Sequence, residues 1–273
     1  ELHNDDVINF LNISESVCIL SDTKNLKGIL EKKSDLQNQD ICMISLDLEK
    51  KSNSTKLDQT EKSEIYYIND CIAKGKEFLI QGNTEFDKIE INPDEMRILL
   101  FTSGTTGNAK GVCLSHKNIC SNITSIYGIV KVKRSDLFFS ILPVHHTYEC
   151  TIGFLLPLYS GASICYCDGL RYILKNMGEY HPSVILCVPL LLENMHKNII
   201  KNMNKTLPKK YVTSLNENPY DKLPGPIKHI VKNKVKNTLG GRLRVFIVGA
   251  AGVNPTIAAD FEKLGLLTLQ GYG

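Results

Sequence analysis

The sequence predicts an α/β protein in which layered β-sheets are flanked by helices. Short apolar and β-branched runs, which are typical of buried strands, recur along the chain, and segments with helical patterning separate them. Strand and helix alternate at least five times, which favours a doubly wound sheet or two stacked sheets with mostly parallel strands. No internal repeat stands out in the sequence.

The first region that we expect, residues 1–92, is a partial α/β subdomain. Its patterning predicts, in chain order, a helix over 5–11, a strand over 16–20, an amphipathic helix over 23–33, a strand over 41–46 and a helix over 66–77. Before the last helix, residues 49–64 contain almost nothing apolar, which predicts a solvated loop.

The second region that we expect covers residues 93–273. Pro93 and Asp94 mark the junction into a buried strand that begins at Ile98. Beyond this strand the patterning predicts a helix over 116–130 capped by Ser115, a strand over 137–142, a helix over 148–159, and strands over 164–166, 184–188 and 243–248.

The apolar strand 98–101 ends in a loop of glycine and hydroxyl residues, and a second apolar strand follows at 112–114. Glycines let backbone N–H groups approach phosphate oxygens closely, and hydroxyl groups and a lysine can donate to a polyphosphate. The simpler alternative is a hairpin turn, but three glycines, four hydroxyls and a lysine within ten residues favour a phosphate-binding loop. Its expected phosphate-binding residues are Thr102, Ser103, Gly104, Thr105, Thr106, Gly107 and Lys110.

A P-loop is the competing motif for this stretch. It requires four residues between its first glycine and a Gly-Lys-Ser/Thr run that opens a helix. Here Ala109 precedes Lys110, Gly111 follows it, and an apolar strand comes next. The sequence therefore disfavours a kinase or GTPase of the P-loop type.

The run from Thr102 to Val112 resembles the phosphate-binding signature of the adenylate-forming, or AMP-binding, family, which includes acyl-CoA synthetases, peptide-synthetase adenylation domains and luciferases. Ala109 stands where that family commonly has proline. The resemblance implies a fragment of the large N-terminal domain of an acyl-CoA synthetase-like fold, with ATP as a substrate. It also implies that residues 93–273 are the nucleotide-binding core, with the phosphate loop, an acyl-pocket segment and an adenine-binding segment. Of the family's Mg²⁺ contacts, it implies only Thr102 in this chain.

A second candidate site follows the strand 137–142, in the run Leu-Pro-Val-His-His-Thr-Tyr-Glu. This run resembles the Leu-Pro-x-x-His-x-x-Glu segment of long-chain acyl-CoA synthetases. The resemblance implies that His146 is the active-site histidine near the acyl carboxylate and that Glu149 is its helical neighbour. A neutral imidazole can donate a hydrogen bond to a carboxylate or an α-phosphate. His145 has no counterpart in the motif and stays unassigned.

Two further segments place small residues after strand-like runs, where a flat ring could lie on the backbone. The first, residues 249–251, resembles the family's Gly-Ala-Ala segment, which contacts adenine. The simpler interpretation is a tight turn between a strand and a helix, and both interpretations can hold. The second resembles the start of the family's Gln-Gly-Tyr-Gly-x-Thr-Glu segment, whose tyrosine stacks on adenine. The residues that these resemblances imply at the nucleotide are Gly249, Ala250 and Ala251 in one segment and Gln270, Gly271, Tyr272 and Gly273 in the other.

Composition limits the binding partners and the cellular compartment that we expect. The net charge of +3 over 273 residues argues against a dedicated nucleic-acid binder. Nine irregularly spaced cysteines, without a second pair to complete a zinc site, favour reduced thiols. No signal peptide is visible, and the longest apolar stretches, 151–167 and 185–192, are interrupted by proline or glycine. We expect a cytoplasmic protein, with peripheral contact to a membrane left open.

Residues 197–236 are unusually basic, with ten lysines, two acidic residues and four prolines. The favoured interpretation is a hydrated, partly disordered excursion. The alternative is a basic patch that faces an acidic membrane surface or the phosphates of coenzyme A. The sequence does not choose between them.

Four ordered matches across residues 98–273 resemble the bacterial long-chain fatty acid–CoA ligases most closely, and in that branch the apolar run 188–192 follows the acyl pocket. The resemblance implies that a fatty acid and ATP, with Mg²⁺, form an acyl-adenylate, and that the acyl group then passes to coenzyme A. Because the chain starts without methionine and stops at Gly273, we expect an excised piece that lacks the C-terminal domain and is inactive alone.

Three alternatives to this function stay open. An aryl or medium-chain acid ligase would keep the chemistry and change the acid. An amino-acid adenylation domain would need an acidic residue to bind the ammonium group of its substrate, and residues 151–158 contain none. A nucleotide-binding module would hold ATP without catalysis.

Overall fold

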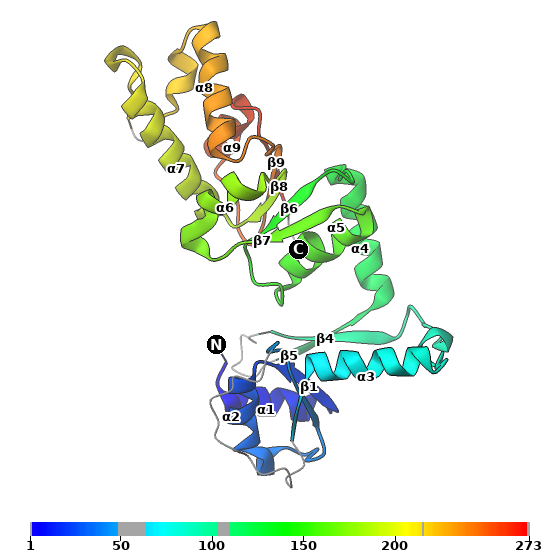
Figure 1. Cartoon of the computed structure of the whole chain (residues 1–273). Coiled ribbons are helices and arrows are strands. Elements are labelled where there is room, and N and C mark those ends of the chain that lie inside the picture. Colours follow the sequence, from blue (N-terminus) through cyan, green and yellow to red (C-terminus); the bar gives the residue numbers. More distant parts are fainter. Residues whose placement is uncertain (1, 49–63, 103–109, 215, 272–273) are drawn as a thin grey trace. The chain divides into compact units, whose positions relative to one another are not determined.

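The computed structural model describes residues 2–48, 64–102, 110–214 and 216–271 (Figure 1). Contacts divide the chain into two compact units, residues 1–116 and 117–273, and each unit is described by itself. We expected a division after residue 92, whereas the contacts group the two strands that flank the phosphate loop with the first unit. The expected division by function stays a prediction.

The first unit contains a parallel sheet in which β2 lies between β1 and β3. Its elements are α1 (Asn4–Ile13), β1 (Cys18–Ser21), α2 (Thr23–Leu30), β2 (Cys42–Ser45), β3 (Ile65–Tyr67) and α3 (Ile68–Ile80). Asp22 caps α2, because its side chain accepts a hydrogen bond from the Asn25 N–H at 2.9 Å. Leu26, Ile29 and Met43 are buried between the helices and the sheet and form its core.

Two expectations for this unit were wrong. The helix expected over 66–77 begins only at Ile68, because residues 65–67 first pair with β2 as a short strand. The strand from Ile98 was expected to be buried, but β4 (Met96–Thr102) is half-buried to exposed. Among the described residues it pairs only with β5 (Lys110–Ser115), so one of its edges has no partner strand. This pairing is antiparallel and confirms the predicted order of strand, loop and strand.

The second unit is built on a parallel sheet of five strands among the described residues, in the order β10–β9–β8–β6–β7. The strands are β6 (Leu137–Ser140), β7 (Ser163–Tyr166), β8 (Val184–Cys187), β9 (Val245–Val248) and β10 (Leu267–Gln270). Every residue of β8 and β9 is buried, as expected for parallel strands between two helical layers. The sheet confirms the predicted α/β fold with helices on both faces.

Helices cover both faces of this sheet, with α4 and α5 opposite α6 and α7 (Figure 1). Successive side chains point to opposite faces, so Phe138 packs in the cluster with α4 and α5, and Phe139 packs in the cluster with α6 and α7. The helices are α4 (His116–Val130), the π-helix η3 (Glu149–Leu155), α5 (Leu156–Ser160), α6 (Ile173–Tyr180), α7 (Pro189–Thr206), α8 (Gly225–Thr238) and α9 (Pro255–Lys263).

Short 3₁₀ turns occur in both units, at Lys33–Asp35, Phe86–Lys88, Leu170–Tyr172, Lys209–Tyr211 and Pro219–Lys222.

A partly buried ion pair joins the strand starts at the edge of the sheet where β6, β8 and β9 begin. The Asp136 carboxylate accepts hydrogen bonds from Arg244 at 2.5 Å, from the Ser183 hydroxyl at 2.8 Å and from the Lys133 N–H at 2.8 Å. Burial by itself would raise the pKa of Asp136, but these hydrogen bonds and the Arg244 charge lower it to about 2. The network therefore joins the starts of three strands, and it lies at the other edge of the sheet from the one where these strands end.

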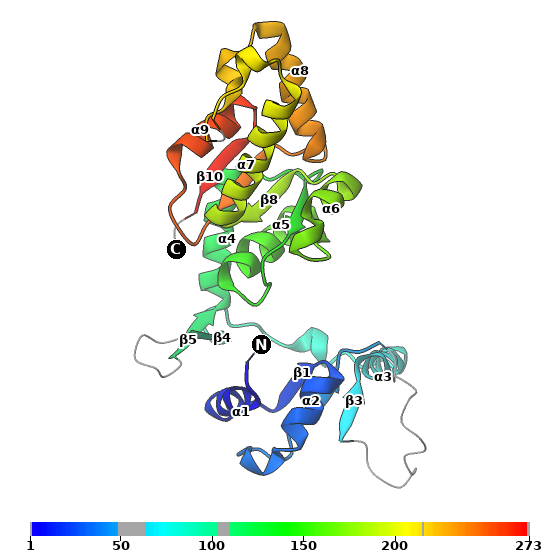
Figure 2. The ribbon, with the colours of Figure 1, turned by 90° about the vertical axis from the view of Figure 1, so that its left-hand side faces the viewer.

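The structure also corrects two expectations for this unit. Residues 148–159 are largely helical as expected, but the first part winds as a π-helix. The basic region 197–236, expected to be partly disordered, is largely helical, and α7 and α8 lie side by side (Figure 2). Its lysines alternate with Ile199, Met203, Val231 and Val235, which are buried and form the helical faces that pack on the core.

No helix in the described part of the chain is long and apolar enough to cross a membrane.

Candidate functional site

The predicted motifs of the second unit all follow the carboxyl ends of parallel strands. His146 follows β6, Gly249 follows β9, and Gly271 follows β10. Parallel strands end at one edge of their sheet, and that edge is where open α/β sheets bind ligands. The strands β6 and β8 are neighbours in the sheet. The chain leaves β6 toward β7 on one side and leaves β8 toward β9 on the other side. Because these two connections diverge, they leave a crevice between the ends of β6 and β8.

His146 lies in a tight turn between β6 and η3. Its N–H donates to the Pro143 carbonyl at 2.9 Å, and its own carbonyl accepts from the Cys150 N–H at 2.9 Å. The imidazole is exposed, and its Nδ1 accepts a hydrogen bond from the Tyr148 N–H at 3.3 Å. A neutral ring with Nδ1 as acceptor carries its proton on Nε2, which leaves Nε2–H to donate to a substrate.

Tyr148 joins three of the motifs, although no role was predicted for it. Its hydroxyl donates to the Ile247 carbonyl at 2.9 Å, and burial raises the pKa of the phenol. A side chain at Gly249 would place its Cβ 2.8 Å from the Tyr148 ring, and one at Gly271 would lie 3.7 Å away. The ring therefore occupies the space that these two glycines leave open, beside the turn that bears His146. The aromatic side chain between the histidine and the glutamate was the only signal in the sequence.

Glu149 is fully buried and begins η3. Its Oε1 accepts a hydrogen bond from the Ser140 hydroxyl at 2.6 Å. Burial raises the pKa of Glu149 to about 7, and the Ser140 hydrogen bond opposes this shift only in part. The sequence identified this residue only as the helical neighbour of His146, because burial depends on the tertiary fold.

The Gly249–Ala251 segment forms the strand-to-helix turn that was its simpler interpretation. The Gly249 N–H donates to the Cys187 carbonyl at 3.2 Å, so the sheet continues for one more residue. Ala250 then adopts φ of 75°, a left-handed conformation that is unusual for a residue with a side chain. Ala250 and Ala251 are both exposed, and the turn leads into α9, which Asn254 caps.

The second adenine segment starts beside the first. The Gly271 N–H donates to the Val248 carbonyl at 2.8 Å, and the Gln270 side chain accepts from the Val253 N–H at 3.3 Å. Tyr272 and Gly273 lie outside the described residues. The structure thus brings the two segments together, and their contact with adenine stays a prediction.

The phosphate-loop residues belong to the first unit. Thr102 and Lys110 face each other as the last pair of the β4–β5 ladder, and the Thr102 hydroxyl donates to the Lys110 carbonyl at 3.4 Å. Both residues are exposed. The predicted ligands between them, Ser103, Gly104, Thr105, Thr106 and Gly107, lie outside the described residues.

Thr102 is the residue that we predict to contact Mg²⁺. Mg²⁺ in nucleotide enzymes is usually held by one or two carboxylates, waters and substrate phosphates. Thr102 offers a single hydroxyl, and the part of the chain that the structure describes contains no group of three or more His, Cys, Asp or Glu side chains able to hold a metal. Thr102 therefore provides at most one of the ligands that such a site needs, and its contact with Mg²⁺ stays a prediction.

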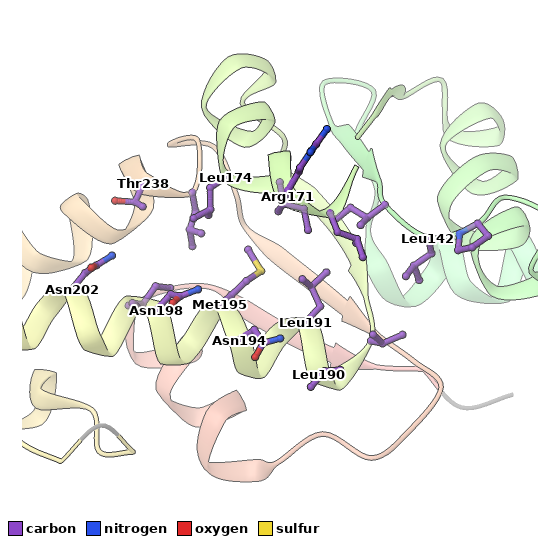
Figure 3. Close-up of a pocket in the computed structure, with 17 residues that line it drawn as sticks. Leu142, Arg171, Leu174, Leu190, Leu191, Asn194, Met195, Asn198, Asn202 and Thr238 are labelled. Carbon is purple, nitrogen blue, oxygen red and sulfur yellow. The ribbon is translucent and has the colours of Figure 1, made fainter. Parts of the chain in front are cut away.

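A large apolar pocket opens at the crevice between β6 and β8, with a volume of about 730 Å³ (Figure 3). It begins at Leu142 and Pro143, in the turn that bears His146, and follows α7 as far as Asn202. From Leu190 to Asn202 the helix rises roughly 18 Å. The walls are mostly aliphatic, and Arg171 is the one charged residue among the described residues that line it. The predicted segment 188–192 contributes to the start of the pocket.

Comparison with known proteins identifies the family. The family model described as AMP-binding enzyme matches residues 1–273. The chain belongs to the AMP-binding enzyme family. This confirms the assignment made from the phosphate-loop and strand-end motifs.

Curated relatives of this chain are fatty acyl-CoA ligases. The long-chain-fatty-acid–CoA ligase 1 of Homo sapiens is 30% identical over 194 residues, which cover 66% of this chain and 28% of that protein. Fatty acyl-CoA synthetase B of Dictyostelium discoideum is 28% identical over 248 residues, which cover 85% of this chain and 35% of that protein. The chain thus spans about a third of the length of these relatives.

Solved structures show the same fold. ATP-bound MatB from Rhodopseudomonas palustris matches with a TM-score of 0.62 and 18% identity, covering 99% of this chain and 43% of that one. The adenylation domain of a carboxylate reductase from Mycobacterium chelonae matches with a TM-score of 0.65 and 16% identity, covering 100% of this chain and 42% of that one. The fold is therefore that of adenylate-forming enzymes.

Proposed function

We propose that this chain is the nucleotide-binding part of a ligase that activates a long-chain fatty acid with ATP. The carboxylate attacks the α-phosphate, an acyl-adenylate forms, and pyrophosphate leaves; the thiol of coenzyme A then displaces AMP to give the thioester. Family membership and the names of the curated relatives support this chemistry.

The observation that supports a long-chain acid best is the 730 Å³ pocket beside the His146 turn. A cavity of about 150 Å³ is enough to hold a benzene ring. The pocket is roughly five times larger, elongated along α7 and mostly aliphatic. An acyl chain would bury its apolar surface along such walls at about 25 cal/mol per Å².

The same pocket argues against the two other acids. An aryl acid would leave most of the volume unfilled. An amino acid would bring an ammonium group, which requires a carboxylate, and no acidic residue among those described lines the pocket. Arg171, the charged residue that does line it, would repel an ammonium group.

Most of the predicted site residues have a role in the proposed first step. The loop from Thr102 to Lys110 holds the β- and γ-phosphates and neutralises their charge. His146 donates its Nε2–H to the acyl carboxylate or to the α-phosphate, and thereby orients the two reacting groups. Gly249–Ala251 and Tyr272 hold adenine. Mg²⁺, contacted by Thr102, would neutralise phosphate charge when bound.

Three further proposals concern the setting of the reaction. The chain alone does not complete the reaction, as its span of about a third of its relatives suggests. The protein is cytoplasmic. The exposed lysines of α7, with those at 209 and 210, contact an acidic membrane surface peripherally.

Pyrophosphate release by the intact protein that contains this chain tests the proposal. We expect release with palmitate and ATP, and little with benzoate or with amino acids. Leu174→Trp fills the pocket from its rim and is expected to raise the KM for palmitate at least 10-fold. Leu158→Trp on α5 is the matched control, because Leu158 is similarly exposed and does not line the pocket. Equal release with benzoate, or equal effects of both variants, would contradict the proposal.

A further inference from the structure

Glu149 is a fully buried ionisable group to which the proposed reaction gives no task. One of its carboxylate oxygens accepts a hydrogen bond from Ser140, and the other, Oε2, has no hydrogen-bond partner among the described residues. Native proteins pair nearly all buried polar atoms, so an unpaired one calls for an explanation. A hydrophobic side chain of similar size would avoid the cost of burying this group.

The surroundings of Glu149 are shaped to accept its carboxyl group. A Cβ at Gly153 would lie within 3 Å of all three carboxyl atoms, so a glycine at this position leaves the space that the group fills. Glu149 and Gly153 both belong to η3, and π-helical turns occur frequently at functional sites. The described residues thus combine an unusual helix, a glycine and a buried acid at one point.

The Ser140–Glu149 hydrogen bond closes a loop of the chain. Ser140 is the last residue of β6 and Glu149 is the first of η3, so the bond joins the two ends of the turn that bears His146. The neighbouring residue, Tyr148, is fixed to β9 by the hydrogen bond from its hydroxyl to the Ile247 carbonyl. The turn is therefore attached to the sheet at two adjacent residues.

The peptide group at this attachment is the one that contacts the histidine. The Tyr148 N–H donates to His146 Nδ1 at 3.3 Å. Tyr148 directly precedes Glu149, whose carboxyl group is hydrogen-bonded to Ser140. Movement of the start of η3 would carry this N–H away from the imidazole. The ring would then lose the interaction that distinguishes its two nitrogens.

We propose that Glu149 is a positioning residue for His146. By joining the start of η3 to the end of β6, it holds the Tyr148 N–H against Nδ1 and keeps the neutral imidazole protonated on Nε2. The use of that Nε2–H in catalysis rests on the proposed function, whereas the choice of tautomer does not.

The test is the tautomer of His146, measured on the ¹⁵N-labelled chain by long-range ¹H–¹⁵N spectra at a pH where the ring is neutral. His145, exposed on the same turn, is the internal reference. In the wild type we expect His146 to be more fully Nε2-protonated than His145. In Glu149→Ala we expect this difference to disappear. In Glu149→Gln, whose side-chain oxygen can still accept from Ser140, we expect it to persist.

Two further variants separate positioning from a general loss of structure. Glu262→Ala changes an exposed residue on α9 and should leave the difference between the histidines intact. Ser140→Ala removes the same hydrogen bond with a smaller change in volume, and serves if Glu149→Ala does not fold. The proposal is overturned if either Glu149→Ala or Ser140→Ala keeps the wild-type tautomer in a folded chain, or if Glu149→Gln loses it. Because no substrate is used, these outcomes are independent of the proposed function.

Discussion

Replacing Glu149 by glutamine is expected to change the stability of the second unit in a direction that depends on pH. Burial raises the pKa of this carboxyl from 4.5 to about 7 in the folded chain. The folded state therefore holds the proton more tightly than the unfolded state does. This group's contribution to stability is fully present below pH 4.5 and is lost as the pH rises through about 7.

The size of the effect follows from the same pKa values. Each pKa unit corresponds to about 1.4 kcal/mol, so ionising Glu149 in the folded chain costs about 3 kcal/mol of the free energy of unfolding. Glutamine never ionises, but it places an amide NH₂ where Oε2 has no partner, at a cost of about 1–3 kcal/mol. Glu149→Gln should therefore be less stable than the wild type at pH 4.5 and as stable or more stable at pH 8.

Hydrogen exchange of the buried amides of β8 is a suitable assay, because it reports the opening of the sheet in the second unit alone. The difference between variant and wild type should shift by about 3 kcal/mol between the two pH values. Glu262→Gln on α9, where the carboxylate is exposed, is the matched control and should show no such shift. A stability difference for Glu149→Gln that is equal at both pH values would show that burial does not raise the pKa of Glu149 as described.

Two other substitutions test the strand ends. Asp136→Asn should lower the free energy of unfolding by about 2 kcal/mol at pH 7, because the folded pKa lies near 2 and the stabilisation is present above pH 3.8. In urea titrations this loss should vanish as the pH falls toward 2; a loss that persists there would contradict the ion-pair explanation. Ala250→Gly should stabilise by about 1 kcal/mol by relieving its left-handed backbone, and Ala251→Gly should not. Equal urea midpoints for both glycine variants would argue against backbone strain.

The elements that the sequence predicted well are those that local pattern determines. The runs at 184–188 and 243–248 are rich in β-branched residues because both faces of β8 and β9 are buried. The short strand 65–67 was missed because it runs directly into α3, without the turn residues that separate elements. The lysines of α7 and α8 concealed buried positions, such as Ile199 and Val231, that recur at helical spacing.

The sequence motifs of the candidate site could be predicted, but the contacts between them could not. His146 and the Gly249–Ala251 turn could be found by resemblance alone. The role of Tyr148 could not, because it depends on the fold placing β9 and β10 beside the turn after β6. The burial of Glu149 likewise depends on tertiary packing, which one sequence does not reveal.

Calorimetric titration of the chain with ATP and with AMP tests whether it binds ATP through the loop from Thr102 to Lys110. We expect binding of ATP, weakened about 10- to 100-fold by Lys110→Ala, because a hydrogen bond to a charged group contributes about 1.5–3 kcal/mol. AMP lacks the β- and γ-phosphates, so the same substitution should leave its affinity unchanged. Absence of ATP binding, or ATP affinity that Lys110→Ala does not alter, would show that this loop does not hold the β- and γ-phosphates.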